Sequence, residues 1–266
     1  MSTAWITGVK ESISSNFAHF GILKDPSFAL EKVTFNDYYY YASGRQHCKY
    51  ALFKIELKKR QCLFSTCTME MIWPKRDMVT IEVPIVIPEY QENGVTTNHI
   101  PLEFMIVRKR NMKSTFSNFG YLKNFVGPVL PKSLVASDLV VLGESDEAGN
   151  HIIDSYVGEQ LSKLGEGHIH EIHFTDQKHY NNYPMWLKAT FYIDTTSEDK
   201  VKESARLVKL LFYMIDRVAT LRLNASNRIK AEKCRKVVEK QRLKEKAEEN
   251  EEAVIQKKRD EQLKFV

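Results

Sequence analysis

The sequence of 266 residues lacks any long apolar run. The best candidate for one, residues 207–218, is interrupted by Lys209, Asp216 and Arg217. Because a helix that spans a bilayer needs about 20 predominantly apolar residues, we expect no membrane span here. Residues 1–10 also lack the basic region and apolar core of a secretory signal peptide. We therefore expect the chain to be soluble on its own and not to be directed into a lumen.

Cysteine is scarce as well. The four cysteines are Cys48, Cys62, Cys67 and Cys234, and they form neither a CxxC pair nor a regular framework. Such a pattern predicts reduced thiols in the cytosol rather than disulfides or a zinc site.

The common motifs of catalysis are also missing. The chain has no GxSxG elbow, no phosphate-binding GxxxxGK[ST] loop, no GxGxxG after a strand, no HExxH and no EF-hand loop. We therefore predict a protein that is not an enzyme and has no cofactor and no small-molecule substrate. An active site dispersed over the chain stays open as an alternative.

Two groups of residues could bind a ligand, although each has a more ordinary explanation. His168, His170 and His173 could hold a metal that favours imidazole, but no cysteine or carboxylate at diagnostic spacing accompanies them. The run Tyr38 to Tyr41 could stack on bases. Alternating tyrosines on a strand more often place one set in the core and the other on the surface.

Two further clusters are equally ambiguous. Methionines and a tryptophan near residues 69–78 could line an apolar groove, but such residues are more often core filler. The acidic residues within 248–252 could attract calcium weakly, but on a helix they point around the axis and cannot converge on one ion.

Hydrophobic patterning predicts an α+β fold with a mixed, largely antiparallel sheet covered by helices. An amphipathic helix is expected over residues 4–20, and neighbouring strands are expected to pair in order, the first two around Ser43-Gly44-Arg45. Residues 134–142 fit either a helix or a strand. Strands are expected over residues 33–42, 50–57, 79–83, 102–107, 168–174 and 186–193, and further helices over 63–74, 113–125 and 152–164.

The clearest signal belongs to the last helix. Thr195 and Glu198 have the spacing of a capping box, and apolar residues then repeat at intervals of three and four up to Ala225. No helix breaker follows, so we expect one long charged helix that leaves the body near Ala225. The predicted division is an N-terminal helix over 1–20, a globular domain over 21–225 and a coiled-coil-like tail over 226–266. The tail lacks a strict heptad, which argues against a homodimeric coiled coil.

Positive charge is concentrated in this tail. Residues 222–246 contain ten Lys or Arg against three Glu, a net charge of +7 for this segment. Exposed cations on a helix bind phosphate backbones, and structured RNA such as ribosomal RNA is a natural partner. A charged helix that serves only as a spacer is the alternative. The residues predicted to contact the ribosome are Arg228, Lys230, Lys233, Arg235, Lys236, Lys240, Arg242, Lys244 and Lys246.

A family resemblance rests on several short segments that occur in order along the chain. They are Ser43-Gly44-Arg45, Lys59-Arg60-Gln61 before a helix that stops at Pro74, Leu130-Pro131-Lys132-Ser133-Leu134, His173-Phe174-Thr175-Asp176-Gln177, and Ile215-Asp216-Arg217 followed by Arg222-Leu223-Asn224. Together they resemble the calumin family, also called the coiled-coil domain-containing protein forty-seven family, of the endoplasmic reticulum.

This resemblance implies a subunit of the PAT complex, a chaperone for multi-pass membrane proteins. Its implied partners are a small Asterix-type membrane subunit, the Sec translocon and the ribosome. Family members have a calcium-binding acidic luminal part and one membrane span, and this chain lacks both. It is therefore similar to the cytosolic part alone, with residues 4–20 near the membrane that the missing span would cross.

We thus expect a scaffold at the cytosolic face of the endoplasmic reticulum membrane that assists the insertion and folding of multi-pass proteins. Its body would dock on the translocon and sister subunits, and its basic tail would contact ribosomal RNA. The alternatives are a calcium-homeostasis protein and a general RNA-binding module.

Overall fold

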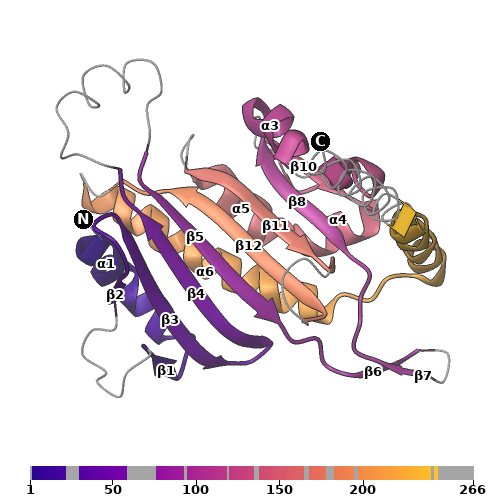
Figure 1. Ribbon diagram of the computed structural model, residues 1–266, viewed down its shortest axis with the longest axis horizontal. Coiled ribbons are helices and arrows are strands. Elements are labelled where there is room, and N and C mark those ends of the chain that lie inside the picture. The colour runs from indigo at the N-terminus through magenta and orange to yellow at the C-terminus, as the bar shows by residue number, and fades with distance from the viewer. Residues whose placement is uncertain are drawn as a thin grey trace, which may run out of the picture.

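The computed structural model describes residues 2–21, 30–58, 76–92, 95–118, 120–134, 138–164, 168–177, 183–194, 197–240 and 243–244. These residues form one large sheet with helices packed on it (Figure 1). No helix within the described ranges is both long and apolar enough to cross a membrane.

The main sheet has ten strands in the order β1-β3-β4-β5-β12-β11-β8-β10-β9, with β2 also paired to β3. Every pairing among these strands is antiparallel. The strands are β1 (His19–Phe20), β2 (Leu30–Lys32), β3 (Asp37–Arg45), β4 (Cys48–Glu56), β5 (Met78–Ile85), β8 (Glu103–Arg108), β9 (Gly127–Val129), β10 (Leu139–Gly143), β11 (Ile169–Thr175) and β12 (Met185–Tyr192). A separate ribbon pairs β6 (Tyr90–Glu92) with β7 (Val95–Thr97).

Helices cover one face of this sheet. They are α1 (Ser2–Ser14), α4 (Asp146–Ile152), α5 (Ser155–Lys163) and α6 (Glu198–Thr220), which all lie behind the strands in Figure 1. Alternate residues of the strands and the apolar side of α6 form one buried cluster, as expected for a sheet with a covered face. The longest helix, α6, crosses behind the central strands.

The N-terminal helix α1 is part of this core. Its side chains Trp5, Val9 and Ile13 are fully buried, and a Cβ at Gly8 would overlap the side chain of Val201 on α6. The absence of a side chain at Gly8 therefore lets the two helices approach closely. The helix expected over residues 4–20 ends at Ser14, and residues 19–20 form strand β1, while the apolar side of the helix packs against the body.

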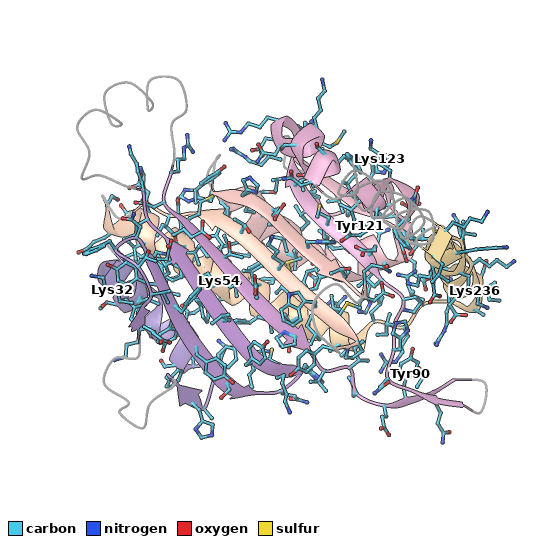
Figure 2. The ribbon with its side chains drawn as sticks, viewed as in Figure 1. Lys32, Lys54, Tyr90, Tyr121, Lys123 and Lys236 are labelled. Atoms are coloured by element: carbon cyan, nitrogen blue, oxygen red, sulfur yellow. The ribbon has the colours of Figure 1, made fainter. Side chains whose placement is uncertain are left out.

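Among the described residues, short helices cover one part of the opposite face of the sheet. The short helices η1 (Lys109–Asn111), α3 (Met112–Asn118) and η2 (Gly120–Asn124) lie over β8 and β10, where they enclose a second small core around Met105 and Leu122. Over β4, β5 and β12 this face carries the Lys54–Glu82 ion pair, at 2.7 Å, and the rings of Tyr50 and Trp186, which meet edge to face with their centres 6.4 Å apart. Lys54 lies on the open face in Figure 2.

The predicted α+β class and the largely antiparallel sheet are confirmed. Strand pairing in sequence order is confirmed for β3 with β4 and for β11 with β12. It is wrong for the middle strands, because β5 pairs with β4 and β12, while β8 pairs with β11 and β10. The ambiguous segment 134–142 contains strand β10, and the helix expected over 113–125 is split into α3 and η2.

The first hairpin also turns two residues later than expected. β3 continues through Arg45, and the turn lies at Gln46 and His47, where His47 has a φ of 61°. Gly44 has a φ of 85° within the strand, a conformation that glycine adopts readily. The helix predicted over 63–74 lies outside the described residues.

Candidate partner-binding surface

The candidate surface is carried by a helix over residues 225–240, called here the C-terminal helix. The prediction of one continuous helix from α6 into the tail is wrong, because α6 ends at Thr220 and residues 221–224 form a non-helical bend. Leu221 is buried at this bend, and the Arg222 guanidinium lies 3.9 Å from the centre of the Tyr90 ring. Thr195, the predicted cap of α6, lies outside the described residues, and Ser197 is at the N-cap.

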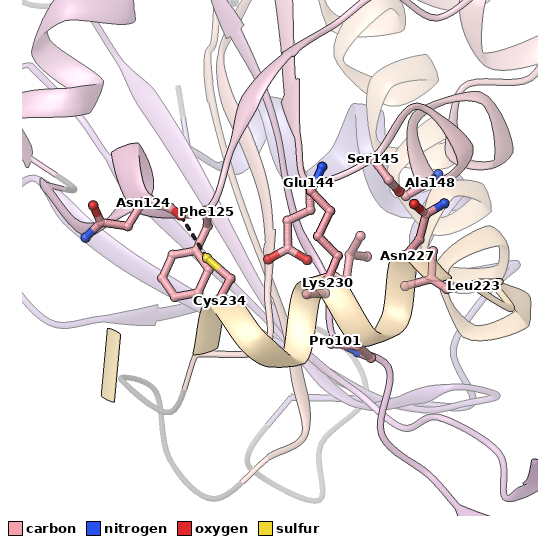
Figure 3. A pocket seen from close by; sticks show the side chains of 12 residues that line it. Pro101, Asn124, Phe125, Glu144, Ser145, Ala148, Leu223, Asn227, Lys230 and Cys234 are labelled. Atoms are coloured by element: carbon pink, nitrogen blue, oxygen red, sulfur yellow. Dashed lines mark hydrogen bonds between the residues drawn. The ribbon is translucent and has the colours of Figure 1, made fainter. Parts of the chain in front are cut away.

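The inner face of the C-terminal helix packs on the body, so the helix does not project into solvent from Ala225 as expected. Ala231 and Val238, seven residues apart, are buried at 6% and 4% exposure. Arg228 donates to the Tyr90 hydroxyl at 3.1 Å. Cys234 Sγ donates to the Asn124 carbonyl at 2.9 Å (Figure 3). The helix is amphipathic, but the face it buries is narrow.

Arg235 makes the most extensive of these contacts. Its Nε and Nη2 atoms donate to both carboxylate oxygens of Asp176, at 2.5 and 2.9 Å. Its Nη1 lies 2.9 Å from Glu144 Oε1 and also donates to the Ala231 carbonyl at 2.9 Å. The guanidinium lies 5.5 Å from the centre of the Phe125 ring. Asp176 follows β11 and Glu144 follows β10, so this one side chain joins the helix to the two strands on either side of β8.

The two buried carboxylates that share Arg235 have pKa values shifted in opposite directions. Burial raises the pKa of Glu144 to about 7, although Arg235 opposes this shift. Burial would also raise the pKa of Asp176, but bonds from His99 and Arg235 outweigh it and hold this pKa below its ordinary value. His99 Nε2 lies 3.4 Å from Asp176 Oδ2. Asp176 therefore stays ionised while Glu144 takes up a proton near neutral pH.

The outer face of the C-terminal helix is exposed and basic. Lys233, Lys236 and Lys240 are all exposed there, and Lys236 is labelled at the end of the molecule in Figure 2. Ile229, at 53% exposure, precedes this row of lysines, and Val237, at 57%, lies next to Lys236. The helix thus combines an anchored inner face with an outer face that is rich in lysine.

The nine predicted contact residues fall into distinct groups. Arg228 and Arg235 point inward and bond within the chain, and Lys230 is exposed beside a groove. The exposed outer residues are Lys233, Lys236, Lys240 and Lys244, while Arg242 and Lys246 lie outside the described residues. Their contact with a ribosome stays a prediction.

A cavity of about 130 Å³ lies beneath the C-terminal helix (Figure 3). Phe125, Leu223 and Ala231 supply apolar walls, and Glu144 and Lys230 supply the charges. A wider groove of about 560 Å³ runs beside it along β9 and the start of α4, between Lys123 and Lys230. Both the cavity and the groove lie where the C-terminal helix packs on the body.

Asp176 and Glu144, the carboxylates that bind Arg235, were not predicted from the sequence. Asp176 is part of the segment His173 to Gln177 that carried the family resemblance, which is the one signal that could have drawn attention to it. Glu144 had no such signal, because nothing in a single sequence pairs it with a residue 91 positions away.

The three histidines do not come together. His168 lies 2.8 Å from Glu203, and His170 packs edge-on against Tyr192. His173 is buried with its Nε2 2.8 Å from Glu103. No group of three or more metal-ligating side chains occurs in the part of the chain that the structure describes.

The remaining candidate features follow their ordinary explanation or are not described. Tyr40 is buried on the helix-covered face, and Tyr41 stacks on Tyr50 on the other face, as expected for alternating tyrosines. Among the methionines of 69–78, only Met78, on β5, is described. The acidic residues 248–252 lie outside the described residues, so the expectation that they cannot converge on one calcium ion is not tested.

Comparison with known proteins identifies relatives over most of the chain. It is 28% identical over 248 residues to an uncharacterized protein of Arabidopsis thaliana, covering 88% of this chain and 49% of that protein. It is 27% identical to the PAT complex subunit CCDC47 of Xenopus laevis and 25% identical to that of Danio rerio. These alignments cover 92% and 95% of this chain, and 53% and 55% of the two relatives.

The chain therefore spans about half the length of the curated relatives it matches. The family model described as PAT complex subunit CCDC47 matches residues 1–264, which confirms the resemblance drawn from the sequence. This chain belongs to the PAT complex subunit CCDC47 family.

Proposed function

We propose that this chain is a non-enzymatic scaffold at the cytosolic face of the endoplasmic reticulum membrane, where it assists the insertion and folding of multi-pass membrane proteins. Family membership supports a role in membrane protein biogenesis, since the frog and fish relatives are named as PAT complex subunits. The proposed partners are an Asterix-type membrane subunit, the Sec translocon and the ribosome.

We further propose that the C-terminal helix contacts ribosomal RNA through its outer face. The observation that carries this proposal is the exposed row of Lys233, Lys236 and Lys240 on a helix whose opposite face is anchored to the body. Exposed ammonium groups gain phosphate contacts with little desolvation, and each contact releases counterions. The lysines are already held at helical spacing, so little ordering entropy opposes binding.

The test is co-sedimentation of the whole chain with purified ribosomes over a series of salt concentrations. We expect the wild-type chain to pellet at low salt and to be released steeply as salt rises. The variant Lys233→Glu, Lys236→Glu, Lys240→Glu should stay in the supernatant at every salt concentration, because three attractive contacts become repulsive.

A matched control carries the same change of charge elsewhere. Lys49, Lys132 and Lys209 are exposed on other elements, and their joint replacement by Glu should leave most of the binding intact. Equal pelleting of the helix variant and the wild type would exclude the ribosome contact. A naked structured RNA that binds as tightly as the ribosome would favour a general RNA-binding module instead.

A further inference from the structure

Arg235 stands apart from the other cations of the C-terminal helix. Its side chain is only 16% exposed, and its partners Asp176 and Glu144 are exposed by 1% and 9%. A side chain so placed cannot reach a partner's phosphate unless the helix first leaves the body.

The elements that meet at this guanidinium come from distant parts of the sequence. The carboxylates follow β11 and β10, the Phe125 ring follows η2, and His99, which contacts Asp176, precedes β8. The bonds to Asp176 use two donors in the plane of the guanidinium, so they fix direction as well as distance.

Apolar burial beneath the C-terminal helix is too small to fix its direction by itself. In the helix as described, Ala231 and Val238 are the buried apolar side chains, and the cavity of about 130 Å³ occupies part of the joint. The polar bonds therefore contribute much of what fixes the orientation of the C-terminal helix on the body.

We propose that Arg235 is a positioning residue, which clamps the C-terminal helix to the ends of β10 and β11 and so holds the outer lysines in one rigid arrangement. Its consequence for the ribosome rests on the proposed function, whereas the clamp itself does not. Arg235 thereby leaves the set of predicted contact residues and acts through Lys233, Lys236 and Lys240.

Amide hydrogen exchange tests the clamp without a ribosome. In Arg235→Gln, the buried Asp176 loses its main partner, and we expect amides within residues 225–240 to exchange about ten-fold faster or more. Amides of β11 should be unaffected. The matched control Lys236→Gln removes the same charge from the adjacent position and should leave exchange unchanged.

Asp176→Asn tests the same bond from the other side. It should accelerate exchange in the helix, and the double variant should be no worse than Arg235→Gln alone, since that change already removes the bonds to Asp176. If Arg235→Gln also accelerates exchange in β11, it has disturbed the sheet, and Arg235→Lys replaces it in the test. Lysine keeps the positive charge but cannot make the bidentate bond to Asp176, so exchange in the helix should still accelerate.

Ribosome binding then separates positioning from contact. We expect Arg235→Gln to weaken binding together with the loss of protection in the helix. Weaker binding with protection unchanged would make Arg235 a direct contact and overturn the proposal, as would unchanged protection and binding. A third outcome separates the two proposals. If Arg235→Gln loses protection in the helix but the triple lysine variant still binds ribosomes, the clamp is supported and the proposed ribosome contact is excluded.

Discussion

The helix α6 and the C-terminal helix follow one another along the chain, yet they are held in different ways. α6 buries a broad apolar side that includes Leu207, Leu211 and Met214, each at most 1% exposed. The C-terminal helix buries only Ala231 and Val238 among its described apolar side chains and is held otherwise by polar contacts, of which those of Arg235 are the most extensive. The free energy of apolar burial does not depend on pH or on a particular orientation of the side chains, whereas that of an ion pair depends on pH and on how its two groups are oriented. The packing of α6 should therefore tolerate a change of pH, whereas the attachment of the C-terminal helix should respond to it.

The largest loss of stability is expected from a cavity on the buried side of α6. Leu211 is fully buried in the main core. Leu211→Ala should lower the free energy of unfolding by about 2 to 5 kcal/mol, the usual cost of such a cavity. Urea denaturation measures the loss, with Leu130→Ala as the control, because Leu130 is 90% exposed and should change stability by less than about 0.5 kcal/mol. A loss of that small size in Leu211→Ala would contradict the assigned core.

The next largest effect is the pH dependence of stability that Glu144 causes beneath the C-terminal helix. Because burial raises its folded-state pKa from 4.5 to about 7, the folded state binds the proton more tightly than the unfolded state. The stabilising contribution of the protonated group is fully present below about pH 4.5 and is lost as pH rises through about 7.

Glu144→Gln removes this titration while keeping the size of the side chain. Between about pH 5 and pH 8, the stability of the variant relative to the wild type should rise by roughly 2 to 3 kcal/mol. Urea denaturation at both pH values measures the difference. Parallel curves for the two proteins would show that Glu144 titrates as an exposed carboxyl does.

The smallest expected effects compare the two faces of the C-terminal helix. Val238 is 4% exposed, so Val238→Ala should weaken the attachment of the helix by about 1 to 2 kcal/mol, two buried carbon groups being lost. Ile229 is 53% exposed, and Ile229→Ala should cost less than about 0.5 kcal/mol. Amide exchange within residues 225–240 measures both. Equal effects would mean that the helix has no fixed inner face.

The elements with a strong period were predictable from the sequence. Alternation predicted β5, β11 and β12, and the three-and-four spacing predicted α6, because side chains with a covered face must match the geometry of the element that buries them. Sheet order was not predictable, since an alternating strand can pair with any other strand of similar pattern. The placement of β5 beside β12 follows from the packing of the whole domain.

The bend at residues 221–224 was missed for a related reason. No proline or glycine marks it, and the residues there are compatible with a helix. Tertiary contacts decide the outcome: Leu221 is buried, Arg222 stacks on Tyr90, and Glu147 accepts bonds from Asn224 N, at 3.2 Å, and from Asn227, at 2.7 Å. The position of Arg235 depends on this bend, so the sequence alone could not separate it from the exposed lysines.

The edges of the large sheet have a consequence for self-association. At one end, β9 consists of Gly127, Pro128 and Val129, and proline has no N–H to offer a further strand. At the other end, β1 and β2, of two and three residues, divide the outer side of β3 between them. Long open edges are the templates on which β proteins polymerise into aggregates. Such short rows of backbone groups are poor templates, so the described strands of this sheet offer little on which copies of the chain could join edge to edge.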